Sequence, residues 1–243
     1  TLIVFDEIQL CERALTSLKY FCEEAPGYHI IVAGSLLGVA ANRANFSFPV
    51  GKVDMKTLYP MDMEEFMLAL GENDLVARIK ESFASDTPLP AALHDAAMQL
   101  YRQYLVIGGM PECVRQFVDT KDYILVRHTQ DTILASYLND MSKYNNLNEI
   151  KKTRLAYDNI TVQLSKKKTR FQYKLIKKGG RASEFENAIE WLCLSGIVSQ
   201  VYKVENVRKP LENYRDIDSF KIYVSDLGLL CAKKGLAAND ILY

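Results

Sequence analysis

The sequence predicts an α/β protein that continues into a helical region and ends in helices followed by a β-hairpin. Over residues 2–58, short apolar runs alternate with stretches of helical periodicity. Helix-like stretches without strands follow, and two strand-like runs lie near the C-terminus. A strand–helix–strand order favours a parallel sheet, because parallel strands need a crossover connection. The 243 residues are 49% hydrophobic and 25% charged, which is typical of globular chains and excludes a disordered or fibrous one.

The N-terminal elements follow from apolar runs and from the residues that end them. The run Leu2–Phe5 is typical of a strand buried on both faces. In the next helix Leu15, Leu18 and Cys22 share one face, and Pro26 with Gly27 ends it. The predicted elements are a strand over 2–5, a helix over 12–24, a strand over 28–33, a short helix over 36–43 and a strand over 53–58.

The rest of the chain is predicted to be largely helical until its last quarter. Asp62 with Glu65 forms one capping box at a helix start, and Ser183 with Glu186 forms another. The second of these helices has its apolar residues at helical spacing, which predicts a buried stripe of Phe185, Ala188, Ile189 and Leu192. The predicted elements are helices over 63–70, 74–84, 91–106, 112–118, 121–142, 150–165 and from 183, then strands over 197–204 and 220–224 around a polar loop over 205–219. Helices followed by such a hairpin resemble a winged helix-turn-helix.

Several classes of protein are not expected. The sequence contains no apolar run long enough to cross a membrane and opens with no basic-then-apolar leader, so we expect a cytoplasmic protein without a membrane segment. The five cysteines include no C-x-x-C pair and the three histidines are isolated, so we expect reduced thiols and no zinc site.

Two adjacent carboxylates follow the first apolar strand. Asp6 and Glu7 would emerge at the carboxyl end of Leu2–Phe5, the edge where open parallel sheets bind ligands. An Asp there can hold a magnesium shell, and a neighbouring Glu can orient or deprotonate an attacking water. The alternative is that both acids only cap the next helix. The following strand ends in Gly34 and Ser35, so a hydroxyl at the same edge either contacts a terminal phosphate or belongs to a plain turn.

A set of short segments resembles a known family. The segments are FDEIQ (Phe5–Gln9), AGSLLG (Ala33–Gly38), LYPMDMEEF (Leu58–Phe66), GGMPE (Gly108–Glu112) and FKIYVSDLGLL (Phe220–Leu230). In this order they are similar to prokaryotic AAA+-type P-loop ATPases that carry a C-terminal domain of unknown function. The resemblance covers nearly the whole chain. It implies a partial P-loop NTPase parallel sheet with helices, then a helical region, then a winged-helix domain.

The resemblance also implies domains and roles. Residues 1–85 would be the C-terminal part of the ATPase core from Walker B to its last strand, 86–148 a helical region, and 149–243 a winged-helix-like domain with the start of a further domain. Asp6 and Glu7 match the Walker-B acids, for Mg²⁺ and for the hydrolytic water, and Ser35 matches the sensor-1 position. Arg43 or Lys52 lies where a phosphate-sensing or trans-acting cation is expected, although either residue is equally a solvated surface charge. The implied cofactors are ATP and Mg²⁺, and the implied activity is ATP hydrolysis.

The chain departs from this family at both ends. It contains no G-x-x-x-x-G-K-[ST] loop, which in the family precedes the Walker-B strand and supplies the N–H cradle and the lysine for the phosphates. The family also continues past the FKIYVSDLGLL segment into a nuclease-like domain. We therefore expect a fragment that binds ATP poorly and is inactive by itself, whereas the full-length protein would be an ATPase.

A strong local charge stands out against a formal net charge of zero. Residues 151–181 carry 11 basic residues and one acid, a net of +10, whereas residues 1–150 carry −8 and residues 182–243 carry −2. Such a segment can attract nucleic acid, with a salt slope of about −5 if roughly six cations meet duplex phosphates. Its basic residues are Lys151, Lys152, Arg154, Lys166, Lys167, Lys168, Arg170, Lys174, Lys177, Lys178 and Arg181, of which those from Lys166 onward are the predicted nucleic-acid contacts.

The sequence leaves several functions open. One is an ATP-dependent switch or motor whose winged helix binds DNA. Another is a DNA- or protein-binding regulator without catalysis, in which the α/β part is a scaffold. A third is protein recognition, for instance between subunits of a homo-oligomeric ring, and the basic segment would equally serve as a solvated face or dock on the acidic N-terminal part.

Overall fold

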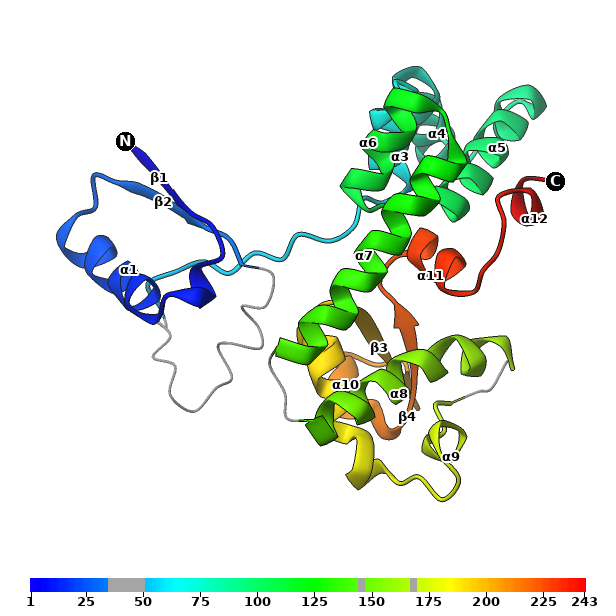
Figure 1. Ribbon diagram of the computed structural model, residues 1–243. Coiled ribbons are helices and arrows are strands. Elements are labelled where there is room, and N and C mark those ends of the chain that lie inside the picture. The colour runs from blue at the N-terminus through cyan, green and yellow to red at the C-terminus, as the bar shows by residue number, and fades with distance from the viewer. Residues whose placement is uncertain (35–50, 144–146, 167–169) are drawn as a thin grey trace.

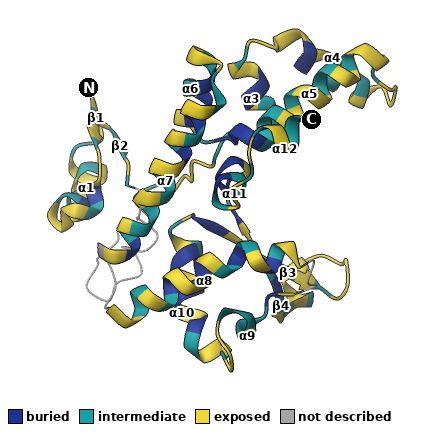
Figure 2. Ribbon diagram, turned by 45° about the vertical axis from the view of Figure 1, so that its right-hand side comes forward, coloured by how far each residue is buried: buried dark blue, intermediate teal, exposed yellow. Residues whose placement is uncertain are grey.

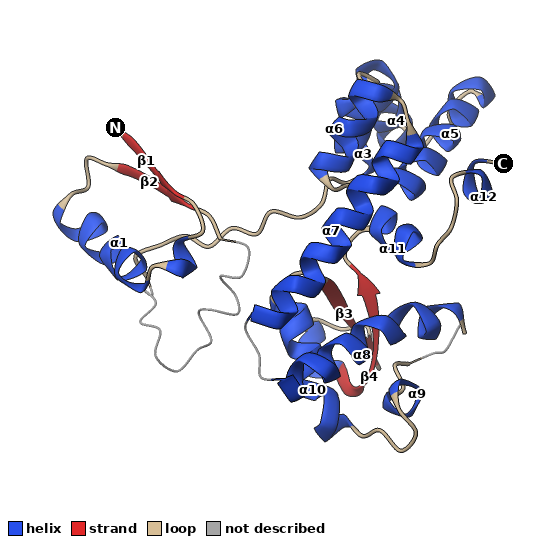
Figure 3. Cartoon of the chain, in the orientation of Figure 1, coloured by secondary structure: helices blue, strands red, loops and turns tan. Residues whose placement is uncertain are grey.

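The computed structural model describes residues 1–34, 51–143, 147–166 and 170–243 (Figure 1). A parallel strand pair with one helix lies at the N-terminus, a group of helices follows, and helices with an antiparallel hairpin form the C-terminal part (Figure 3). The elements are β1 (Leu2–Phe5), η1 (Ile8–Leu10), α1 (Glu12–Glu24), β2 (His29–Val32), α3 (Met63–Ala69), α4 (Asn73–Ala84), α5 (Ala91–Ile107), α6 (Pro111–Thr120), α7 (Tyr123–Lys143), α8 (Leu147–Ser165), α9 (Tyr173–Ile176), α10 (Ala182–Leu194), β3 (Val198–Val204), η2 (Leu211–Tyr214), β4 (Arg215–Val224), α11 (Leu227–Lys233) and α12 (Asn239–Leu242).

The N-terminal unit confirms the predicted strand–helix–strand order. β1 and β2 run parallel, with Leu2 opposite His29 and Phe5 opposite Val32. α1 buries Leu15 and Leu18 together with Ile8, whereas Cys22 is exposed. The opposite face of the sheet is left open, because Leu2, Val4 and Ile31 are each more than half exposed.

The strand predicted over 53–58 is not formed. Residues 54–62 have neither helix nor strand structure, and the side chains of Leu58 and Tyr59 are 93% and 74% exposed. A strand needs a neighbour to pair its backbone groups, and β1 and β2 pair only with each other in the described part of the chain. This extended segment connects the N-terminal unit to the helices (Figure 1). The helix predicted over 36–43 lies outside the described residues.

The helices from α3 to α7 share a core of their own. The capping box at the start of α3 is confirmed, since the Asp62 carboxylate accepts the N–H of Glu65 at 2.9 Å and the Glu65 carboxylate accepts the N–H of Asp62 at 2.9 Å. α3 packs on α5 and α6 as well as on α4. The buried members of this core are Phe66, Ile107, Cys113, Val114, Phe117 and Val126.

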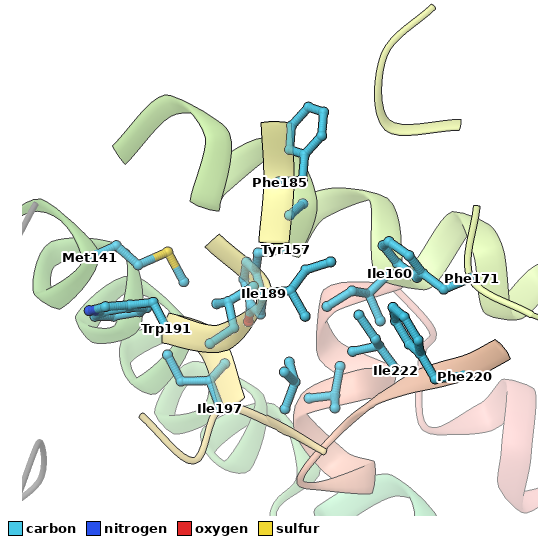
Figure 4. Packing of buried hydrophobic residues seen from close by; sticks show 14 of the residues in the cluster. Met141, Tyr157, Ile160, Phe171, Phe185, Ile189, Trp191, Ile197, Phe220 and Ile222 are labelled. Atoms are coloured by element: carbon cyan, nitrogen blue, oxygen red, sulfur yellow. The ribbon is translucent and has the colours of Figure 1, made fainter. Parts of the chain in front are cut away.

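The C-terminal part is built around the helix stripe that the sequence predicted. Phe185, Ala188, Ile189 and Leu192 are buried along α10, which packs on α8 and on β3. Figure 4 shows the surrounding core, in which Trp191 lies beside Met141 and the rings of Phe171 and Phe220 lie together. Figure 2 shows that the outward faces of these helices are largely exposed.

Two local expectations for the C-terminal part are wrong. α10 begins at Ala182 after Arg181, whose side chain makes no cap bond, so Ser183 does not form the predicted capping box. β4 begins at Arg215 and not at 220, because Arg215 and Asp216 pair with the end of β3 beyond a register shift. The sequence also missed α9, α11 and α12. The order of helices and hairpin is as predicted, and its interpretation as a winged helix stays a prediction, as do the proposed domain boundaries.

Candidate functional site at the carboxyl edge of the parallel strands

Asp6 and Glu7 lie where the sequence predicted them, at the carboxyl end of β1. The N–H of Ala33 donates to the carbonyl of Phe5 at 2.8 Å, and the N–H of Ile8 donates to the carbonyl of Ala33 at 3.1 Å. These two bonds clamp the exit of β1 to the exit of β2. Both acidic side chains are exposed, so they are open to a ligand at this edge.

Glu7 has an unusual backbone conformation. Its φ and ψ are 49° and 42°, in the left-handed region that a residue with a side chain rarely adopts. The carboxylate of Asp6 accepts the N–H of Glu7 at 2.9 Å, and the side-chain amide of Gln9 donates to the carboxylate of Glu7. Such a conformation costs roughly 1–3 kcal/mol and is concentrated at functional sites. The local bonds therefore hold Glu7 in a strained and oriented position.

The donor set suits one mode of magnesium binding. Mg²⁺ is commonly held by one or two carboxylates together with substrate phosphates and waters. Oδ1 of Asp6 accepts the N–H of Glu7, and Oδ2 has no partner among the described residues. In that same part of the chain no group of three His, Cys, Asp or Glu side chains comes together to enclose a metal. Asp6 therefore fits a metal ion that is also bound by a phosphate ligand. The described residues do not form a metal site made of protein side chains alone.

Of the other predicted members of the site, the described part of the chain contains only Lys52. Ser35 and Arg43 lie outside the described residues. Lys52 forms an ion pair with Glu23 at 3.2 Å. Glu23 is in the last turn of α1, which leads back to the amino end of β2, so Lys52 lies at the edge opposite Asp6. The structure therefore argues against Lys52 as the phosphate-contacting cation.

A cavity of about 580 Å³ runs along the free edge of β2. Its walls include the consecutive residues Ile30, Ile31 and Val32 of β2, and the segment from Lys52 to Lys56 faces them. Consecutive strand residues point to alternate faces of a sheet, so a cavity that touches all three lies at the edge of the strand. The cavity separates β2 from the segment that was expected to form the next strand.

A second cluster of motif residues surrounds a buried carboxylate, which sequence reasoning missed. Asp226 is 3% exposed, and it accepts the N–H of Gly109 at 2.6 Å and the N–H of Leu229 at 2.8 Å. Burial raises the pKa of Asp226, and backbone N–H groups around the carboxylate partly offset this. The bond to Gly109 joins the GGMPE segment to the SDLGLL segment, which are 117 positions apart.

The glycines at this joint are required by close packing. A Cβ on Gly109 would lie 1.9 Å from the carbonyl oxygen of Met61, and a Cβ on Gly228 would lie 2.3 Å from that of Ile107. Gly108 has a φ of 78°, which favours glycine. The GGMPE turn is therefore a packing joint between α5, α6 and α11.

Comparisons with known proteins divide the chain in a similar way. The profile of a domain of unknown function, DUF8612, matches residues 98–240, more than half of the 243 residues. The chain belongs to the DUF8612 family. The profile of an AAA domain matches residues 1–67, which contain Asp6 and Glu7. No curated protein matches the chain.

A solved structure supports the fold. The Walker-type ATPase PABY2304 of Pyrococcus abyssi superposes with a TM-score of 0.56 at 12% sequence identity. The match covers 96% of this chain and 63% of the archaeal chain, so the present chain spans less than two thirds of that protein's length. The AAA match and this neighbour together place the N-terminal part among P-loop ATPase-like folds, as the sequence motifs predicted.

The DUF8612 region contains the basic segment and the Asp226 joint. Its cations lie in the first half of α8, after the end of that helix, in and around α9 and just before α10. The described cations from Lys166 onward are exposed: Lys166, Arg170, Lys174, Lys177, Lys178 and Arg181. Lys167 and Lys168 lie outside the described residues. Lys177 forms an ion pair with Glu184 at 2.8 Å, so part of the charge is neutralised locally. None of the described helices in this region or elsewhere is both long and apolar enough to cross a membrane.

Proposed function

We propose that this chain is the part of an ATP-hydrolysing P-loop ATPase that carries the Walker-B acids. The observation that supports this is the pair Asp6 and Glu7 at the shared carboxyl edge of parallel β1 and β2, with Glu7 held in a left-handed backbone conformation. An adjacent pair of acids that only capped a helix would not need this strain, and neither side chain caps η1 or α1.

The two acids have different roles in this proposal. Asp6 is exposed, and its Oδ2 would hold Mg²⁺, which supplies charge neutralisation on the phosphates when it is bound. Glu7 would accept a hydrogen bond from the attacking water and take its proton. The Gln9 amide, which donates to the Glu7 carboxylate, fixes the direction of that side chain. Ser35 would contact the terminal phosphate from the end of the next strand.

The cavity beside β2 lies where the strand that precedes a phosphate-binding loop would be. We propose that a strand ending in such a loop pairs with the free edge of β2 and fills the cavity between β2 and the segment Lys52–Lys56. Strands in a sheet are about 4.8 Å apart, so this strand would lie roughly 10 Å from β1. That separation leaves room for a nucleotide phosphate and its metal between the loop and Asp6.

The test uses the natural protein that contains this chain. Glu7→Gln should abolish ATP hydrolysis and leave ATP binding within about twofold, because the amide keeps the size of the side chain and removes the base. Asp6→Asn should weaken binding of ATP in the presence of Mg²⁺ more than in its absence. Glu12→Gln, on an exposed acid in the first turn of α1, is the matched control and should keep wild-type turnover. Unchanged turnover in Glu7→Gln would remove Glu7 from the mechanism, whereas a wild-type protein that does not hydrolyse ATP would favour the regulator without catalysis.

We propose further that the C-terminal helices and hairpin act as a winged-helix module that binds nucleic acid. The support is the charge of residues 151–181 and the exposure of its described cations from Lys166 onward. Binding should weaken steeply with salt, because each neutralised phosphate releases counterions. The combined charge reversal Lys166→Glu with Lys174→Glu should lower the affinity and flatten the salt dependence. An affinity that responds neither to salt nor to these charges would exclude this part of the proposal.

A further inference from the structure

The exposed face of α10 is unsuited to a nucleic-acid groove. In a helix-turn-helix the second helix inserts into the major groove, and α9 with α10 would be that pair. Ser183, Glu186, Asn187, Glu190 and Leu194 form the exposed stripe of α10, and the opposite stripe is buried in the core. A groove lined by phosphates repels the two carboxylates of this stripe. The nucleic-acid contact therefore has to lie elsewhere on the module.

A different place combines cations with aromatic rings. A cavity of about 280 Å³ lies between β4 and the C-terminal end of α8, with Arg170 and Lys221 as its cations and Phe171 and Tyr223 as its aromatic residues. No carboxylate is among the described residues that line it. The Tyr223 side chain is 38% exposed, so its ring is accessible to a stacking partner.

The cavity is held in shape by bonds on both sides. The Gln163 amide of α8 accepts the N–H of Gln172 at 2.7 Å, and the N–H of Phe171 donates to the carbonyl of Phe220 at 2.7 Å. The ring of Phe171 stacks on that of Phe220 with centroids 5.7 Å apart. Arg170 is thus followed by two fixed residues, of which Phe171 is bonded to the strand and Gln172 to the helix.

The free edge of β4 adds polar groups to the cavity. Alternate residues of a strand direct their backbone groups to the same side. Since the carbonyl of Phe220 points away from β3 to Phe171, the backbone of Ile222 points to that side as well, where Ile222 lines the cavity. A planar base could therefore meet a backbone donor and acceptor at its edge.

We infer that this cavity is the contact site for single-stranded nucleic acid. One base enters beside Phe171 and stacks on Tyr223, and the phosphates on either side of it meet Arg170 and Lys221. Single-stranded binders combine a cationic path for the backbone with aromatic residues for the bases, and this is the combination found here. A paired base is not free to enter a cavity, so the site selects single strands over duplex. This inference rests on the proposed nucleic-acid role of the C-terminal module.

The experiment measures binding of fluorescein-labelled dT12 to the whole chain by fluorescence anisotropy over a range of salt concentrations. A 12-base-pair duplex and a 12-residue poly-glutamate peptide are the comparison ligands. The variants are Arg170→Glu, Lys221→Glu and Tyr223→Ala, with Lys234→Glu, at the exposed residue that follows α11, as a matched control. Circular dichroism verifies that each variant is folded, and Arg170→Gln provides a milder change at the same place.

We expect dT12 to bind more tightly than the duplex and the peptide. Arg170→Glu and Lys221→Glu should each lower the affinity at least ~10-fold and reduce the salt slope by about 0.7 or more. Tyr223→Ala should lower it ~5-fold or more through lost stacking. Lys234→Glu should change the affinity for dT12 by less than ~2-fold, and this change measures the effect of net charge alone. The double variant Glu186→Gln with Glu190→Gln should not raise the affinity beyond that effect of net charge.

Other outcomes overturn the inference in distinguishable ways. If nucleic acid binds with salt dependence but the cavity variants match Lys234→Glu, the cavity is not the site and the broader nucleic-acid role survives. If neutralising Glu186 and Glu190 strengthens duplex binding while the cavity variants have no effect, α10 is the contact helix after all. If only the duplex binds, the inference is wrong and the nucleic-acid role survives. If neither dT12 nor the duplex binds, or the peptide binds equally well, both the inference and the nucleic-acid role are wrong, and the ATPase proposal is unaffected.

Discussion

Replacement of Asp226 tests whether its carboxylate holds the helical region and the hairpin together. In Asp226→Ala the N–H groups of Gly109 and Leu229 lose their acceptor in a buried place. Each unsatisfied buried group costs about 1–3 kcal/mol, so the two together predict a loss of ~4 kcal/mol in the free energy of unfolding. Asp226→Asn keeps the shape and one acceptor oxygen, but its NH₂ group would face a backbone N–H. We therefore expect a loss of ~2 kcal/mol for that variant.

The pH dependence gives an independent signature of the same carboxylate. Burial raises the pKa of Asp226 in the folded chain above its ordinary value of 3.8. Between the unfolded and the folded pKa, the folded state binds more protons than the unfolded state. The free energy of unfolding contributed by this group therefore falls as the pH rises through that window, and it recovers as the pH falls. Asp226→Asn should remove this component of the pH profile.

The assay uses the only tryptophan of the sequence. Trp191 lies in the same core cluster as Leu229, so urea unfolding followed by its fluorescence reports on the part of the chain that Asp226 fixes. A loss of ~4 kcal/mol corresponds to a fall in Tm of roughly 8–16 °C for a chain of this size. Asp131→Asn, on the exposed side of α7, should change stability by less than ~0.5 kcal/mol. A loss below ~1 kcal/mol in Asp226→Ala would refute the view that this carboxylate is the joint.

Four further substitutions test particular features. Glu7→Gly should relieve the strain of a left-handed backbone, which costs ~1 kcal/mol, and should therefore slow hydrogen exchange at the amides of β1 and β2. Faster exchange would show that no strain is present. In thermal melts, Gly109→Ala should lower the free energy of unfolding by more than ~3 kcal/mol, because the added Cβ meets a backbone carbonyl. Gly27→Ala is the control and should change that free energy little, because its Cβ meets nothing within 4 Å. Tyr157→Phe should leave stability unchanged or raise it by up to ~1 kcal/mol in urea titrations, since its buried hydroxyl has no partner in the described residues; a loss larger than that would reveal a hidden partner. Asp62→Ala should cost ~1 kcal/mol in thermal melts through the lost capping box of α3, and an unchanged Tm would mean that the cap contributes nothing.

The features that the sequence predicted well are governed by neighbours along the chain. The helix over Glu12–Glu24 and the capping box at Asp62 depend on residues within a few positions, and both are confirmed. Asp6 and Glu7 were placed correctly because a strand delivers the residues that follow it to its own carboxyl edge. The amphipathic stripe of α10 was predicted for the same local reason.

The features that it missed depend on distant partners. The strand expected over 53–58 has the right composition, but pairing is decided by what lies beside it in space. The left-handed conformation of Glu7 leaves no mark in composition, and a glycine would have been the usual sign of it. The joint between Gly109 and Asp226 spans 117 positions. Both of its segments resemble segments of ATPases, and nothing in either segment indicates that the two are in contact.

The two connections between parts of this fold differ, and the difference bears on how ATP binding at Asp6 and Glu7, as proposed, would affect the C-terminal module. Asp226 and the close-packed glycines join α5, α6 and α11 without room for sliding, so the helical region and the hairpin should move together. The N-terminal unit, in contrast, continues into the helices through residues 54–62, which have no regular structure and expose Leu58 and Tyr59. A change at Asp6 and Glu7 can then act on the rest of the chain most directly by reorganising this segment, for instance by pairing it with a strand in the cavity beside β2. We therefore expect nucleotide binding in the natural protein to protect the amides of residues 53–58 from hydrogen exchange, and equal exchange with and without nucleotide would argue that the two parts work independently.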